Sequence, residues 1–497
     1  MRETRRNNAC KPRAPAGRAS ALPPSKALRV QTNFSPDQLA DVHIAEADKI
    51  LKSCQHYGFC TSGCPTYVLL HDENDSPRGR IDLIKEMLES GPAPRAQTVA
   101  HLDRCLSCMS CMTTCAVQVD YMHLIDTARV HIEKTYSRPL PDRLLRELLA
   151  FVLPRPRLFA AMLALGRLGR PLKPLLPAGL RRLVDFIPPP AAARRPALTI
   201  YPAAGPRRWR VALLAGCVQP VIAPHINDAT LRLLTRFGCE VVVPESAGCC
   251  GSLNLHMGKA EAARASARRN VLAWLAEMQG EGLDAIIVNA SGCGTTVKDY
   301  GHLFLDNEAE RLDAEKIAAL CHDICEWLTA MALPEPAEPR RLRVTYHDAC
   351  SLRNAQKVTA EPRALLRHAG FIVSDVPESH FCCGSAGTYN LLQADIARQL
   401  GERKASHIAG TRPQIIAAGN IGCLTQIARY SAAPIVHTVE LLDWAHGGET
   451  PPALRDLVLQ AHPPGIESPI ADAAGSSQPI RIHPRGTATD AAGQAIW

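Results

Sequence analysis

Apolar residues recur at helical spacing in the N-terminal part of the chain. The pattern runs from Asp37 to Lys52, and shorter patterns of the same period cover Arg80–Leu88 and Tyr121–Lys134. Two groups of cysteines stand between these predicted helices. Residues 36–137 are therefore expected to form a small helical domain built around cysteine side chains.

The following stretch, residues 138–206, is rich in Leu, Arg and Pro. Helical patterns cover Leu144–Leu153 and Leu158–Leu168, and the prolines around them limit this stretch to short helices. We interpret the stretch as an amphipathic linker that packs on a neighbouring domain. A basic, apolar surface for a membrane or a partner is the alternative.

From residue 207 to residue 446, short apolar runs of strand type alternate with helical patterns. This alternation predicts parallel sheets covered by helices. The predicted strands are Arg210–Leu214, Glu240–Val243, Ala285–Asn289, Leu342–Tyr346, Phe371–Asp375 and Gln414–Ala417.

The cysteines in this part of the chain reveal an internal repeat. In each half, one cysteine is followed after 31 residues by a Cys-Cys-Gly triplet, and a further cysteine closes the unit. The two units are assigned to residues 207–335 and 336–446. Each repeated cysteine comes shortly after a predicted strand, where α/β sheets place their ligands, so four thiols per unit should meet at one rim. The first set is Cys217, Cys249, Cys250 and Cys293, and the second is Cys350, Cys382, Cys383 and Cys423.

The expected fold class is thus α+β and multidomain, with a helical domain followed by two repeated α/β domains. Residues 1–35 and 447–497 lack apolar periodicity and are expected to be a disordered basic arm and a disordered tail.

The net charge of +8 is concentrated in residues 1–35 and 138–185. No nucleic-acid-binding signature accompanies the basic arm, so we expect no nucleic-acid partner. The N-terminal arginines precede no apolar run of a secretory signal, and no window is long and apolar enough to span a membrane. A cytoplasmic location follows as the expectation, and any membrane contact would be peripheral or through a partner.

The motif with the clearest chemistry is C-x2-C-x2-C-x3-C, formed by Cys105, Cys108, Cys111 and Cys115. This spacing is used for cubane clusters in two-cluster ferredoxins, where three cysteines hold one cluster and the fourth reaches the other. A zinc knuckle would normally use paired C-x2-C units separated by a longer loop. The motif therefore indicates iron–sulfur clusters.

The first cysteine group repeats this spacing with one change, because Tyr57 stands where a cysteine is expected. Crossed ligation would leave the second site one thiolate short. A three-iron cluster, a labile four-iron cluster with a non-cysteine ligand and a lost cluster are all open there. The complete set would be Cys64, Cys105, Cys108 and Cys111, and the incomplete set Cys54, Cys60 and Cys115.

Weaker candidates surround these cysteines. A histidine near a metal more often supports a ligand than binds the metal, and we favour this reading for His256, His347 and His380. Asp348 is interpreted as a turn or helix-cap residue.

The arginines Arg78 and Arg80 could balance cluster charge or cap a helix. The cysteines Cys10, Cys239, Cys321 and Cys325 fit no group; the last two are one helical turn apart, which favours a core position.

The segment Cys54–Ile84 resembles the iron–sulfur subunit family of glycolate oxidase, through Cys64-Pro65-Thr66-Tyr67 and Pro77-Arg78-Gly79-Arg80-Ile81. The later units resemble the cysteine-rich CCG domains shared by that family and heterodisulfide reductase. The resemblance there rests on Gly216-Cys217-Val218-Gln219, Cys249-Cys250-Gly251 and Cys382-Cys383-Gly384.

The resemblance implies an oxidoreductase subunit in which companion flavin-binding subunits oxidise glycolate or a similar 2-hydroxyacid. This chain would accept electrons singly on its 4Fe-4S clusters and pass them toward a membrane quinone, at the inner face of the cell membrane. The sequence agrees, since it contains no dinucleotide fingerprint, phosphate-binding loop or nucleophile elbow.

The sequence departs from the family's cysteine pattern at two places, and these departures limit which ligands the resemblance implies. Besides Tyr57, the fullest CCG motif closes with C-x2-C, whereas Thr296 and Gln426 occupy the last positions here. Each unit offers four cysteines, so a single cluster and a structural zinc are both open. The alternatives for function are a related lactate or glycerol 3-phosphate dehydrogenase subunit, a heterodisulfide-reductase-like catalyst, and a zinc-stabilised scaffold.

Overall fold

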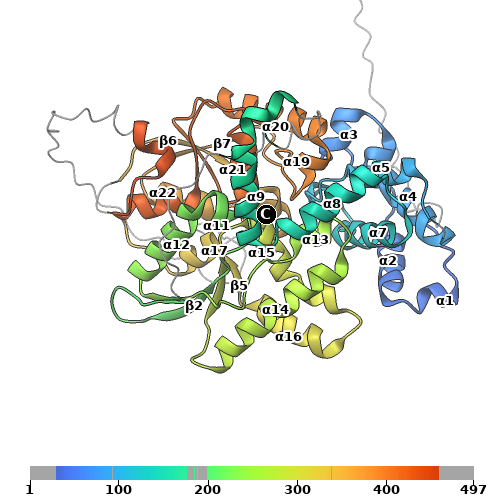
Figure 1. The fold of residues 1–497 in the computed structure, drawn as a ribbon, viewed down its shortest axis with the longest axis horizontal. Coiled ribbons are helices and arrows are strands. Elements are labelled where there is room, and N and C mark those ends of the chain that lie inside the picture. The colour runs from blue at the N-terminus through green and yellow to red at the C-terminus, as the bar shows by residue number, and fades with distance from the viewer. Residues whose placement is uncertain are drawn as a thin grey trace, which may run out of the picture.

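The computed structural model describes residues 29–91, 93–175, 184, 187–188, 199–336 and 339–457. A helical N-terminal domain lies beside a larger α/β body made of two similar units (Figure 1). This arrangement confirms the expected fold class.

The N-terminal domain is helical, and two of its cysteines stand at helix ends: Cys54 directly follows α2 and Cys64 directly precedes α3. One long helix was expected over 37–52, but Asp41 caps the His43 N–H and starts a second helix there. The helices are α1 (Pro36–Leu39), α2 (Val42–Ser53), α3 (Pro65–Leu70), η2 (Glu73–Asp75), α4 (Pro77–Ser90), α5 (Ala96–Asp103), α6 (Ser110–Thr113) and α7 (Tyr121–Thr135).

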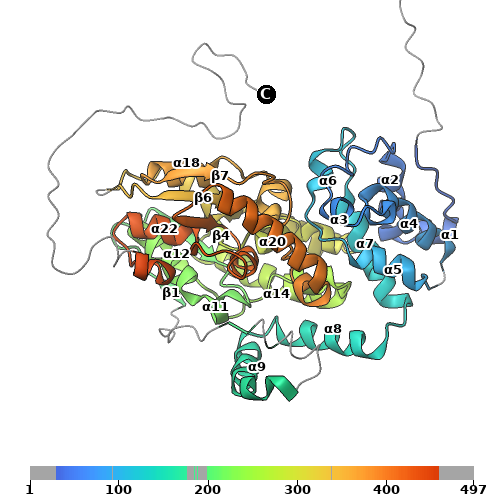
Figure 2. The same ribbon diagram turned by 90° about the horizontal axis from the view of Figure 1, so that it is seen from above.

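Two helices leave this domain, α8 (Leu140–Val152) and α9 (Pro156–Leu168), and the turn η3 (Arg170–Leu175) follows them. The prolines act as expected, because Pro156 is the first residue of α9 and cannot continue α8. In Figure 2 the pair lies below the rest of the molecule, and Leu149 and Ala150 of α8 pack against Met257 of the first α/β unit, as expected of a linker that packs on a neighbouring domain.

Each α/β unit contains one sheet. The first has the strand order β1-β3-β2-β4-β5 and the second β7-β6-β8-β9. All neighbouring strands are parallel except β1 and β3. The strands are β1 (Ile200–Tyr201), β2 (Trp209–Leu213), β3 (Cys239–Val242), β4 (Ala285–Val288), β5 (Cys321–Asp323), β6 (Arg343–His347), β7 (Ile372–Asp375), β8 (Ile415–Ala418) and β9 (Ile435–His437).

The helices of the two units cover these sheets. In the first unit they are α11 (Gln219–Ile222), α12 (Pro224–Arg236), α13 (Ser252–His256), α14 (Ala260–Gln279), α15 (Ser291–Lys298), η4 (Tyr300–Phe304), α16 (Glu308–Ala319) and α17 (Ile324–Ala330). In the second they are η5 (Ser351–Ala355), α18 (Glu361–His368), α19 (Tyr389–Leu392), α20 (Ala394–Gly410), α21 (Ile421–Ile427), α22 (Thr438–Ala445) and η6 (Pro452–Leu454).

All six predicted strands are present, each shifted by no more than one residue at either end. The strands β1, β5 and β9 were not predicted, because they are two or three residues long and β5 carries polar residues. Cys321 lies in β5 and Cys325 in α17, so the two do not share a helix as their spacing suggested. Both are buried, as expected for core residues.

The described chain extends beyond the predicted domain limits. Val30 is buried, and its N–H donates to the Cys54 carbonyl, so packed structure begins before residue 36. Strand β1 pairs with β3 although the first α/β unit was expected to start at residue 207. Leu454, in the predicted tail, is also buried. The expected disorder of residues 1–28 and 458–497 falls outside the described residues.

The two units share strand order and one hydrophobic core. In the first unit β2 lies between β3 and β4, and in the second β6 lies between β7 and β8. The strand order therefore reverses between β2 and β4 and between β6 and β8, which makes a topological switch point in each sheet. Helices α12 and α22 pack against each other across the units. Asp443 of α22 is buried and accepts hydrogen bonds from Arg232 and Arg236 of α12.

A histidine joins the helical domain to the first α/β unit. His123, on α7, contacts Asp120 of its own domain and Asp299 at the end of α15. It also stacks on His302, with ring centroids 3.4 Å apart. Burial lowers the pKa of His123, but the two carboxylates outweigh burial and raise the pKa to about 10.

His123→Gln should therefore remove a pH-dependent contribution to stability. Because the folded pKa lies above the unfolded value of about 6.5, the contribution is complete below pH ~6.5 and is lost as the pH rises toward 10. We expect the variant to be less stable by about 1.5–3 kcal/mol at pH 6 and equal to wild type near pH 10. Urea unfolding at both pH values measures this. Equal losses of stability in both proteins between pH 6 and pH 10 would contradict it.

Candidate metal centres

Four cysteines of the helical domain line one cavity. Ser107 and Met109 adopt positive φ angles of 47° and 57°, so the loop between α5 and α6 coils tightly on itself. Its cysteines meet the cysteine that precedes α3. The four are Cys64, Cys105, Cys108 and Cys111, and all are buried.

A second cavity lies beside the first. It is lined by the remaining cysteines of this domain, and Cys111 lines both cavities. The side chain of Tyr57 also lines it, is 51% exposed, and donates its hydroxyl hydrogen to the Gln55 side-chain oxygen. The remaining cysteines are Cys54, Cys60 and Cys115.

The electrostatics of these cavities disfavour free thiolates. Burial raises the pKa of Cys108 and Cys111 well above the ordinary value. The pKa of Cys60 is raised to about 11, by burial first and then by the neighbouring sulfur atoms of Cys54 and Cys115. A cation bound among these thiols would offset both effects, so the donor set fits the iron–sulfur clusters expected from the cysteine spacing.

One buried arginine lies beside the first cavity. Arg80 and Asp75 form an ion pair in which each side chain is only 1% exposed. The Arg80 guanidinium also donates to Thr66 at 3.0 Å, and its Nη1 is 3.9 Å from the Cys64 sulfur. Ser76, not Arg80, caps helix α4. Arg80 therefore lies beside the Cys64 sulfur and does not cap the helix.

The other candidate arginine, Arg78, lines the second cavity and binds Glu73.

The four repeated cysteines of the first α/β unit form a connected group. Cys249 interacts with Cys217 and Cys250, and Cys250 interacts with Cys293. The backbone N–H of Gly251 donates to the Cys249 sulfur at 3.4 Å.

The third residue of the Cys-Cys-Gly triplet has to be glycine. Gly251 has φ 93°, and a Cβ there would lie 2.9 Å from the Ala263 carbonyl oxygen. Gly384, its counterpart, has φ 90° and would place a Cβ 2.6 Å from the Ala397 carbonyl oxygen. The close packing of α14 and α20 against these glycines holds the paired cysteines at the rim.

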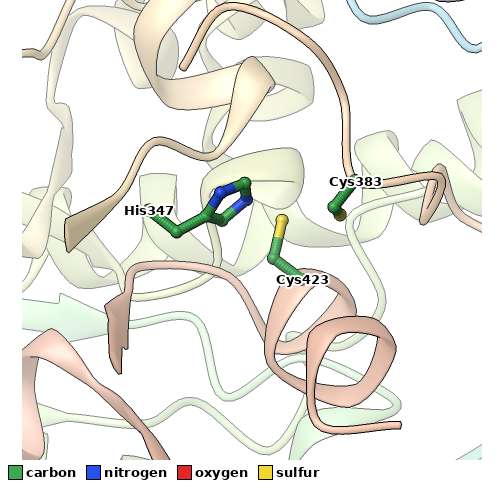
Figure 3. Close-up of side chains that lie close together, drawn as sticks. All are labelled: His347, Cys383 and Cys423. Carbon is green, nitrogen blue, oxygen red and sulfur yellow. The ribbon is translucent and has the colours of Figure 1, made fainter. Parts of the chain in front are cut away.

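The repeated cysteines of the second unit are also grouped. The sulfur atoms of Cys350 and Cys382 are 3.8 Å apart, and Cys383 interacts with both Cys382 and Cys423. His347 enters this group: its imidazole and the sulfur atoms of Cys383 and Cys423 lie within 4.8 Å of one another (Figure 3). Burial lowers the pKa of His347 well below its ordinary value, which keeps the imidazole neutral.

The other two candidate histidines lie differently. His256 contacts Ser252 at 3.2 Å and comes within 3.9 Å of Asp126. The ring of His380 packs on Phe381. Among the described residues, neither belongs to a group of donor atoms that could hold a metal.

The cysteines of the second unit lie against the first cavity. Cys108 and Cys382 share a buried apolar cluster with Leu106, and Cys350 packs against that cluster. The Asn354 side chain donates to the Cys108 carbonyl at 2.8 Å. The first unit adjoins the second through Ser291, whose hydroxyl lies 2.7 Å from that of Ser351. The thiol groups of the helical domain and of the second unit thus lie in adjoining parts of the interior, and the first unit adjoins the second.

Several remaining candidates have structural roles. Asp348 binds Arg363 and Arg353 instead of capping a helix. Cys239 is buried in β3 near Met331. Cys10 lies outside the described residues.

One buried cation near the second group was not considered from sequence. Lys404, on α20, is 2% exposed and donates to the Glu378 carbonyl. Burial lowers its pKa, while the nearby sulfur atoms of Cys383 and Cys382 act in the opposite direction. The sequence could have indicated this burial, because Lys404 occupies a position in an apolar stripe of helical spacing formed by Ile396, Leu400 and Ile408.

Comparison with known proteins agrees with this architecture. Residues 9–119 match the 4Fe-4S dicluster domain family, and residues 211–298 and 344–428 match the cysteine-rich domain family. The chain is 40% identical over 420 residues to the glycolate oxidase iron–sulfur subunit of Escherichia coli, covering 84% of this chain and 99% of that protein.

Two further relatives extend the comparison. A probable glycolate oxidase iron–sulfur subunit of Bacillus subtilis is 30% identical, over 79% of this chain and 93% of the relative. Lactate utilization protein A of Bacillus licheniformis is 25% identical, over 47% of this chain and 99% of the relative. The identity and near-complete coverage of the Escherichia coli protein show that this chain belongs to the family of glycolate oxidase iron–sulfur subunits.

Proposed function

We propose that this chain is the electron-carrying subunit of a flavin-dependent glycolate dehydrogenase, and that it passes single electrons from flavin-binding partner subunits toward a membrane quinone. The observation that carries the proposal is the adjoining arrangement of buried thiol groups from the helical domain and the second α/β unit. Chemistry on the 2-hydroxyacid belongs to the partner subunits, because this chain has no nucleotide-binding fingerprint.

In this proposal the cysteines around the first cavity hold a 4Fe-4S cluster. The three cysteines around the second cavity hold a three-iron or labile four-iron cluster, because Tyr57 supplies no thiolate. The phenol of Tyr57 already donates to Gln55, and it would have to become a phenolate to serve as a strong ligand. When bound, these clusters supply one-electron transfer.

The surrounding residues set the conditions for that chemistry. Buried apolar side chains around Cys108 and Cys382 exclude water from the region between the helical domain and the second unit. Arg80 places a positive charge near Cys64, which favours the more negative, reduced state of the centre. The cysteine sets of the two α/β units are proposed to bind metal as well.

The chain is proposed to reach the membrane through helices α8 and α9. Leu140, Leu144, Leu148 and Phe151 form one exposed stripe along α8, and Leu165 and Leu168 of α9 are exposed too. Exposed arginines Arg143, Arg155 and Arg157 accompany the stripe. Within the described residues, no helix is long and apolar enough to cross a bilayer. An apolar stripe with basic neighbours suits the surface of an anionic membrane, on the helix pair visible in Figure 2.

A second candidate substrate is lactate, because lactate utilization protein A resembles about half of this chain. The partner subunits determine the substrate, so the two candidates are separated by measuring the whole complex.

The substitution Cys108→Ser tests the function directly. It should remove about four iron atoms per chain and lower the melting temperature of the helical domain, because the cluster also stabilises the fold. Membranes from cells with this variant should lose glycolate-dependent quinone reduction and retain lactate-dependent reduction. Cys239→Ala, in a core position, is the matched control and should keep iron and activity. A colourless wild-type chain that contains only zinc after anaerobic reconstitution would overturn the proposal.

The substitution Tyr57→Cys tests the incomplete site. It should add roughly one iron atom per chain and convert a three-iron signal into that of a second cubane, seen by electron paramagnetic resonance. Tyr57→Phe removes only the hydroxyl group and should leave both measurements unchanged. Two ordinary cubanes in this domain of the wild-type protein, with no effect of the cysteine, would refute the ligand-deficient site.

The double substitution Leu144→Glu and Leu148→Glu tests the membrane surface. Burial of each leucine in a bilayer stabilises binding by about 1.5–3 kcal/mol, so binding to vesicles containing phosphatidylglycerol should fall at least ~10-fold. Leu272→Glu, an exposed leucine on α14, is the control and should bind like wild type. Vesicle sedimentation measures both. Unchanged binding of the double variant would exclude α8 as the membrane contact.

A further inference from the structure

The two α/β units differ at one position close to their cysteine groups. Leu214 stands three residues before Cys217, and His347 stands three residues before Cys350. The two positions correspond, since Leu214 directly follows strand β2 and His347 ends strand β6, each beside the switch point of its sheet. The repeat therefore replaces a buried leucine by a buried imidazole at the rim where the thiols meet.

The environment of His347 is unusual for a buried histidine. The residue is 1% exposed, and neither ring nitrogen has a hydrogen-bond partner among the described residues. A buried polar nitrogen without a partner costs about 1–3 kcal/mol. The sulfur atoms of Cys383 and Cys423 lie within 4.8 Å of a ring nitrogen (Figure 3). A metal held between these three atoms would satisfy the imidazole.

We infer that His347 is a metal ligand of the second unit, so that an iron–sulfur centre there takes one nitrogen and four thiolates. The inference rests on the proposed function, since it assigns iron–sulfur chemistry to this unit. In the first unit, Leu214 offers no donor atom, and its centre takes thiolates only. His347 thus supplies the fifth donor in a unit whose sequence has Gln426 where the fuller motif has a cysteine.

The two centres should then differ in reduction potential. A neutral imidazole adds no negative charge, and histidine in place of cysteine raises the potential of iron–sulfur centres. The buried cation Lys404 acts in the same direction. Its counterpart in the first unit is Asn270, because each residue stands seven positions after the alanine that packs on the triplet glycine. The second unit should therefore hold the more oxidising of the two centres.

The test is pulsed electron paramagnetic resonance on the full chain, purified anaerobically with ¹⁴N- or ¹⁵N-histidine. Wild type should show nitrogen coupling to a centre, with the frequency change expected for the isotope. The coupling should disappear in His347→Leu, which copies the first unit, and in His347→Cys. His380→Leu, a histidine on the same loop as Cys382, should retain it.

Redox titration provides a second readout. In His347→Cys, which keeps a fifth donor and so preserves the centre, the midpoint potential of one centre should fall while those of the helical domain stay unchanged. Absence of nitrogen coupling in wild type, its persistence in His347→Leu, or zinc in place of iron in the second unit would overturn the inference. These outcomes leave the clusters of the helical domain intact, whereas failure of the proposed function would appear as absence of iron from the whole chain.

Discussion

The interior of this protein is organised around thiol groups that are buried away from water. Burial raises the pKa of thiols such as Cys108 and Cys111, so ionising them without a nearby cation is costly. Iron–sulfur centres offset that cost, and in small domains their binding energy is also folding energy. The helical domain reflects this dependence, because its apolar cluster includes Cys54, Cys105 and Cys111.

The α/β units also bring buried thiol groups together, but they do so with a parallel sheet. A parallel sheet with a switch point places the segments after its two central strands next to each other, and each unit puts its single cysteines there, with Cys293 and Cys423 in the first turns of helices α15 and α21. The paired cysteines reach the same place because the following glycine permits close contact with a long helix. The two units keep the same arrangement of cysteines but differ in the neighbouring donor and charged residues, as Leu214 and His347 illustrate.

The contacts between domains bring these sites together. The two units share one core and the buried contact of Asp443 with two arginines, so they are fixed relative to each other. The second unit lies directly against the loop that carries Cys108, through Asn354 and Tyr389. Close, dry contact between neighbouring sites is the arrangement that the proposed electron transfer requires.

The sequence by itself determined the features that depend on local spacing. The helical domain, the six longer strands, the repeat and the identity of the iron–sulfur motif all follow from residues that are near one another in the chain. Its periodicity could not reveal the two- or three-residue strands β1, β5 and β9, whose positions are fixed by pairing with distant strands.

Only the tertiary structure decided what surrounds each side chain. The sequence favoured the same supporting role for His256, His347 and His380, yet His347 alone is enclosed with two thiols, because strand β6 ends beside the start of α21. Likewise, Arg80 is a buried neighbour of Cys64, and the hydroxyl of Tyr57 is directed to Gln55. Such neighbours come from segments far apart in sequence, and their burial and charge depend on packing that no local pattern records.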